Sequence, residues 1–138
     1  MSKTKETLAR RWMASKHWGG TRDGMVDASP GNEGNLVYGS NIEGVPVTLW
    51  QGCGSRPRQR LSPEFLPELD HPGTRAFLLE DVRRAWGCCV VLHPPCTLRP
   101  RFWACEVERV DSGVVFWQRF QKRTEAEALI AALEACDG

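Results

Sequence analysis

The sequence has no hydrophobic run long enough to cross a membrane, because each of its apolar segments is only a handful of residues long. Its first residues, MSKTKETLARRW, are charged and lack the apolar stretch of a secretory signal. We therefore expect the protein to remain in a reducing cytoplasm. In that compartment its six cysteines do not imply disulfide bonds.

A strong charge of either sign is also missing. The formal net charge is +1, so the chain has neither the acidic surface of a nucleic-acid mimic nor the basic excess of most nucleic-acid-binding proteins. With 138 residues, of which 41% are hydrophobic, the composition is that of one ordinary globular domain.

The motifs of the common enzyme classes are absent from the chain. It contains no G-x-S-x-G, no H-E-x-x-H and no Walker-type loop. Cys53 lies between two glycines near Arg56 and Arg58, a permissive setting for a thiolate. A nucleophilic cysteine also needs a positioned base, however, and nothing in the pattern supplies one. We predict a protein that is not an enzyme, with no catalytic residue and no cofactor.

The stretch WGCCVVLHPPC, residues 86 to 96, concentrates cysteine and histidine. Zinc sites usually take two ligands from a C-x-x-C pair, and this chain has none. Neighbouring side chains of a strand point to opposite faces, so Cys88 and Cys89 are poorly placed to share one metal. We predict a strand here, with the two cysteines facing opposite ways and at least one of them buried, and no metal site.

Periodicity and turn residues predict three helices and six strands. Leu8 and Trp12, spaced i, i+4, indicate an amphipathic helix, and Thr124 with Glu127 fits a capping box. Asp111-Ser112-Gly113 is typical of a hairpin turn. The predicted helices cover residues 4–16, 74–86 and the segment opened by Thr124, with one helical turn at 63–69. The predicted strands lie near 24–28, 36–38, 45–50, 88–93, 102–110 and 114–120.

This order predicts an α+β fold, a small antiparallel sheet with helices packed on it, in the order α-β-β-β-α-β-β-β-α. One domain over residues 1–138 is the simplest organisation. An N-terminal lobe at 1–51, a basic loop at 52–62 and a C-terminal αβββα unit at 63–138 is the alternative division.

Tryptophan is unusually frequent, with six residues against one tyrosine. Trp86 and Trp117 fall at core positions of predicted elements, whereas Trp18 lies in a glycine-rich turn. Exposed tryptophan with arginine neighbours is typical of interface anchors. The predicted protein-binding residues are Trp18, Trp50, Arg56, Arg58 and Arg60. Arginine beside an aromatic ring also suits stacking on nucleic acid, so Arg99, Arg101 and Trp103 form an alternative site.

Two segments carry a resemblance. DHPGTRAFLLEDVRRAWG, residues 70 to 87, and TEAEALIAALEA, residues 124 to 135, resemble short uncharacterised accessory proteins of tailed bacteriophages and prophages. Those proteins commonly combine an Asp-Pro-x-Thr helix start, a Leu-Leu-x-x-Val-Arg-x-Ala-Trp-Gly helix and a closing Thr-Glu-Ala-Glu-Ala-Leu helix. The resemblance covers about half of the chain, which departs from the pattern at His71 and in the 51–62 loop.

The resemblance implies a viral accessory protein of the host cytoplasm and carries no catalytic residues. Proteins of that class include inhibitors of host defence, such as anti-CRISPR proteins. The expected function is thus binding of a host protein or complex, with the blocking of a defence system as the expected role. A small nucleic-acid-binding regulator is the alternative, and no membrane partner is expected.

Overall fold

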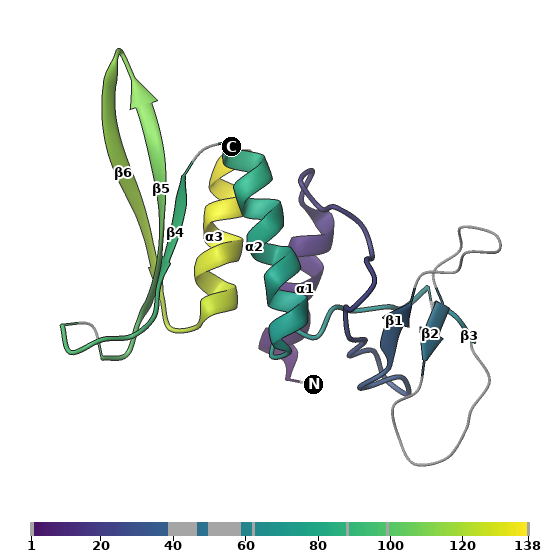
Figure 1. The fold of residues 1–138 in the computed structure, drawn as a ribbon. Coiled ribbons are helices and arrows are strands. Elements are labelled where there is room, and N and C mark those ends of the chain that lie inside the picture. Colours follow the sequence, from purple (N-terminus) through teal and green to yellow (C-terminus); the bar gives the residue numbers. More distant parts are fainter. Residues whose placement is uncertain are drawn as a thin grey trace. The chain divides into compact units, whose positions relative to one another are not determined.

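The computed structural model describes residues 2–38, 47–49, 59–61, 63–87, 89–98 and 100–137, and for 38, 47–49, 59–60 and 137 the main chain alone. The elements follow the predicted order (Figure 1). They are α1 (Lys3–Ala14), β1 (Leu36–Tyr38), β2 (Val47–Leu49), β3 (Gln59–Arg60), α2 (Pro72–Trp86), β4 (Val90–His93), β5 (Trp103–Asp111), β6 (Val114–Lys122) and α3 (Glu125–Asp137). Within these ranges, no helix has the length and apolar character to span a bilayer.

The strands form two antiparallel sheets, β1-β2-β3 and β4-β5-β6, which confirms the α+β class. Contacts divide the chain into two compact units, residues 1–13 with 19–77 and residues 14–18 with 78–138. The single domain over 1–138 stays a prediction. The expected 52–62 loop lies largely outside the described residues, and its end, Gln59–Arg60, pairs with β2 as β3.

In the first unit the buried Asp27 holds two segments together. Its Oδ1 accepts hydrogen bonds from the main-chain N–H groups of Ser29, at 2.8 Å, and Leu66, at 3.4 Å. The strand predicted at 24–28 and the helical turn predicted at 63–69 are both wrong, because the two segments meet in a single isolated bridge, Asp27 with Pro67. A residue before proline is driven toward extended geometry, which explains why Leu66 is not helical.

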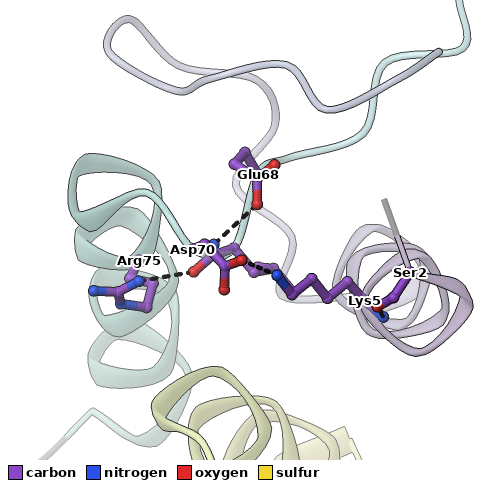
Figure 2. Close-up of polar contacts among 6 residues, drawn as sticks. Ser2, Lys5, Glu68, Asp70 and Arg75 are labelled. Atoms are coloured by element: carbon purple, nitrogen blue, oxygen red, sulfur yellow. Dashed lines mark hydrogen bonds and ion pairs between the residues drawn. The ribbon is translucent and has the colours of Figure 1, made fainter. Parts of the chain in front are cut away.

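The start of α2 is tied to α1 within this unit (Figure 2). Lys5 forms an ion pair and a hydrogen bond with the Asp70 carboxylate, and the hydrogen bond raises the pKa of Lys5. The main-chain N–H of Asp70 donates to the Glu68 carboxylate at 3.1 Å. The helix begins at Pro72, two residues before the predicted start, since proline suits the first helical turn. Thr74, at the predicted start, lies inside the helix and is buried, and its Oγ1 accepts from Val26 N–H at 3.1 Å.

In the second unit α3 lies along one face of the β4-β5-β6 sheet and contacts β5 and β6 (Figure 1). Leu129, Ile130 and Leu133 of α3 are fully buried. The last turns of α2 and α3 are also joined. Trp86 Nε1 donates to the carbonyl of Ala132 at 3.0 Å, and the Cys136 thiol donates to the carbonyl of Ala85 at 3.2 Å. The sheet therefore has one face covered by helix.

The N-cap half of the predicted capping box is present at the start of α3. Thr124 Oγ1 accepts from Glu127 N–H at 3.2 Å, and the Thr124 hydroxyl donates to Glu127 Oε1 at 3.0 Å. Replacing Thr124 with alanine leaves that amide without its acceptor, so we expect the free energy of unfolding to fall by about 1 kcal/mol. Urea denaturation measures the change. Thr97→Ala, in an exposed loop, is the control, and an equal loss in both variants would contradict the capping role.

Candidate protein-binding surface

The β5–β6 hairpin is the longest sheet element among the described residues, with nine residues in each strand. Its two-residue turn, Ser112-Gly113, has positive φ at both positions, 52° and 81°, as the favoured type I′ hairpin turn requires. The turn fixes the register from Asp111 opposite Val114 to Trp103 opposite Lys122. The predicted hairpin is thus confirmed, and β6 runs two residues beyond its predicted end.

The register assigns every hairpin side chain to one of two faces. The inner face, toward the helices, includes Cys105 and Val107, both fully buried, and the ring of Phe120, whose centroid lies 6.5 Å from that of Trp86. The outer face is the opposite side of the sheet. It carries Val91, His93, Glu106, Glu108, Val110, Val115, Trp117 and Arg119.

A row of charged side chains crosses the outer face over all three strands. Glu106 of β5 accepts from Arg119 of β6 through Nε at 2.9 Å and through a terminal guanidinium nitrogen at 2.7 Å. His93 of β4 places Nε2 3.6 Å from the same Glu106 oxygen, within ion-pair range when the imidazole is protonated. This row fixes polar groups on the outer face at defined positions.

Toward its tip the hairpin exposes apolar side chains on both faces. The exposed fractions are 67% for Val110, 63% for Val114, 56% for Val115, 42% for Phe116 and 47% for Trp117. These five residues form the tip patch. They follow one another along the two strands, whereas apolar surface residues of a monomeric protein are usually scattered singly.

Near the tip lies a hollow of about 500 Å³, lined by Trp86, Glu108, Arg109, Val110, Asp111, Phe116, Ala135 and Cys136. The guanidinium of Arg109 lies 4.7 Å from the ring centroid of Trp86, a cation–π arrangement. Its Nε is buried and has no hydrogen-bond acceptor among the described residues. The hollow therefore offers an aromatic wall and an unused donor.

Most of the site residues predicted from the sequence lie outside the β5–β6 hairpin. Trp18 is half-buried, and its N–H donates to the carbonyl of Ser15 at 3.0 Å. Arg60 lies in β3, of which the main chain alone is described, while Trp50, Arg56, Arg58 and Arg99 lie outside the described residues. Arg101 is exposed, and Trp103 is half-buried opposite Lys122. These interface assignments stay predictions.

The prediction that Trp117 is a core residue is wrong, because its side chain is 47% exposed. Its backbone lies in a strand as predicted, but its side chain is on the outer face, opposite Glu108. The sequence carried a sign of this. Val114-Val115-Phe116-Trp117 is an uninterrupted apolar run, and in a strand such a run places apolar groups on both faces, whether or not both are covered.

The cysteine stretch forms a strand, but only from Val90 onward. Cys89 is exposed like Val91, and Val90 is buried, so the predicted alternation holds for these three residues. Cys88 lies outside the described residues, so its orientation stays a prediction. In the part of the chain that is described, no three His, Cys, Asp or Glu side chains gather as metal ligands would.

No protein-family model matches this chain, and no curated protein or solved structure is significantly similar to it.

The cysteines should differ sharply in reactivity. Burial, followed by the charge of Glu106, raises the pKa of Cys105 from 9.0 to about 11. At pH 8 this lowers its thiolate fraction roughly 100-fold, and the thiolate is the reactive form. We expect iodoacetamide to modify the exposed Cys89 and Cys96 before Cys105, as measured by peptide mass spectrometry over time. Modification of Cys105 in the native protein at the rate of Cys96 would contradict its burial.

Proposed function

We propose that this protein acts by binding another protein, and that the β5–β6 hairpin is its binding surface. The observation that carries the proposal is the tip patch, whose five apolar side chains are each between 42% and 67% exposed. Three of them, Val110, Val115 and Trp117, adjoin on the outer face, and contiguous exposed apolar surface is typical of interaction sites. Trp117 is the residue best suited to anchor a partner, because tryptophan gains most from desolvation in a protein interface.

The charged row supports the same surface. A protein interface usually combines an apolar centre with a polar rim. On the outer face, Val110, Val115 and Trp117 would supply the centre, and Arg119 with Glu106 would supply a polar border. The side chains of this border are already held in place by hydrogen bonds of 2.7 and 2.9 Å, so little of their freedom remains to be lost on binding.

The partner's identity is a finer proposal. The resemblance of residues 70–87 and 124–135 to phage and prophage accessory proteins supports a host protein as the partner. On that basis we propose occlusion of a bacterial protein complex, with a defence complex as the first to test. The interface predicted from Trp18, Trp50, Arg56, Arg58 and Arg60 remains a second surface for the same role.

Nucleic-acid binding through Arg99, Arg101 and Trp103 remains the weaker proposal. Its support is the register that places Lys122 beside Trp103, near the exposed Arg101. Contacts to phosphates release counterions, so such binding would weaken steeply as salt is raised. Burial of the tip patch would respond far less to salt, and this difference separates the two proposals.

We expect the tagged protein to recover a stoichiometric protein from nuclease-treated bacterial lysate. Trp117→Ala should weaken that capture by about tenfold or more, because truncating an anchoring tryptophan removes both contact area and packing. Leu98→Ala is the matched control. Leu98 is also a large exposed apolar residue, at 92%, but it lies outside the hairpin. Quantitative mass spectrometry of the eluates measures the recovery.

Three outcomes would count against the proposal. Recovery of no stoichiometric protein would oppose protein binding altogether. Equal loss with Trp117→Ala and Leu98→Ala would oppose the hairpin as the surface. Loss of the captured protein on nuclease treatment alone would favour the nucleic-acid alternative.

A further inference from the structure

We propose that β6 pairs edge to edge with β6 of a second copy of this chain, which joins two three-stranded sheets into one six-stranded sheet. The pairing is made by main-chain groups at the β6 edge, and it also brings Phe116 and Trp117 of the tip patch beside the second copy. This self-association goes beyond the proposed function and can be measured with the purified protein alone.

The two edges of the sheet differ in how they are protected. Strand order β4-β5-β6 makes β4 and β6 the edges. β4 has four residues and runs into Pro94-Pro95, and both shortness and proline discourage further strand pairing. β6 has nine residues and no proline, and in the described part of the chain no strand pairs with its second side. An edge of this kind is suited to pairing with another strand.

A single hydrogen bond defines which β6 groups point outward. Glu108 N–H donates to the carbonyl of Cys89 at 3.1 Å, so the main-chain groups of Glu108 point at β4 and away from β6. Trp117 lies opposite Glu108. In an antiparallel ladder, the main-chain N–H and C=O groups of two opposite residues either both point toward the other strand or both point away from it. The N–H and C=O groups of Trp117 therefore point away from β5. By the two-residue period, those of Val115, Arg119 and Gln121 do so as well.

These four outward residues select one register for a symmetric pair. An antiparallel pair centred on Gln118 places Val115 opposite Gln121 of the second copy, and Trp117 opposite Arg119. It uses all four residues twice, for about eight main-chain hydrogen bonds. A pair centred on Trp117 uses fewer of them. One centred on Arg119 brings two guanidinium groups face to face, which like-charge repulsion opposes.

Charge and polarity along β6 favour a second copy as the occupant. The half nearest the turn is apolar, from Val114 to Trp117, and the cations Arg119 and Lys122 lie in the other half. An antiparallel copy reverses this order, so each cation meets an apolar or aromatic residue. Trp117 opposite Arg119 permits a cation–π contact, and on the inner face Phe116 lies opposite Phe120 of the other copy. The strand is thus complementary to itself.

Two charge-designed double variants test the register. Val115 and Gln121 are both exposed on β6, and the proposed pairing brings them face to face. Val115→Glu with Gln121→Glu places like charges opposite each other twice, so we expect the dimer dissociation constant to rise by about tenfold or more. Val115→Lys with Gln121→Glu places opposite charges there and should keep the dimer. Sedimentation equilibrium over a concentration series measures both, with circular dichroism as the check on folding.

The outcomes are decisive in each direction. A dimeric wild type, dissociated by the Glu/Glu pair and retained by the Lys/Glu pair, supports the proposal. A wild type that stays monomeric at millimolar concentration overturns it, as do two double variants that behave alike while both are folded. If either variant is unfolded, wild-type cross-linking between copies decides: crosslinks joining β6 to β6 support the proposal, and their absence in a dimer overturns it. None of these measurements involves another protein, so they are independent of the capture experiment.

Discussion

The turn at Ser112-Gly113 fixes which side of the hairpin meets the helices. Because both residues have positive φ, the turn is two residues long and sets Asp111 opposite Val114. All nine pairs of the ladder follow from that pair. A slip of one residue would turn Phe120 to the outer face and bring Arg119 toward the helices. Burial of Cys105 and Val107 beneath α3, and the ion pair of Arg119 with Glu106, therefore depend on this turn.

The hairpin is covered along only part of its length. Along β5, side chains pass from fully buried at Cys105 and Val107, through the half-buried Arg109 on the Trp86 ring, to the exposed Val110. The chain nevertheless continues with valine, phenylalanine and tryptophan beyond the covered part. These side chains add little to the stability of the unit while they face water, since apolar groups stabilise a fold by leaving water. A binding role would explain why the hairpin carries apolar residues beyond the part that the rest of the unit covers.

Local signals predicted much of the fold. The N-cap at Thr124, the hairpin turn and the apolar spacing of the helices each depend on residues a few positions apart, and each is confirmed within small shifts of the boundaries. The segments around Asp27 and Pro67 were mispredicted because their pairing joins residues forty positions apart in a single isolated bridge. No periodicity accompanies such a contact. Local pattern therefore suggested a strand and a helical turn where the chain has neither.

The candidate surface was harder to predict than the fold. Alternation along β6 tells which side chains share a face, but it does not tell which of the two faces α3 covers. Trp117 was consequently assigned to the core, while arginine-rich segments drew the predicted interface to residues 50–60. The orientation of main-chain groups at the β6 edge could not be inferred from side-chain pattern at all. It follows from the bond between Glu108 and Cys89.

Residue-resolved amide hydrogen exchange tests most directly whether alternate N–H groups of β6 bond to β5 while the others point to its free edge. In dilute protein the account predicts slow exchange for Phe116, Gln118 and Phe120, which are bonded to β5, and fast exchange for Trp117 and Arg119, with the latter two slowing as concentration rises. Uniform protection along β6 at all concentrations, or the opposite alternation, would contradict it.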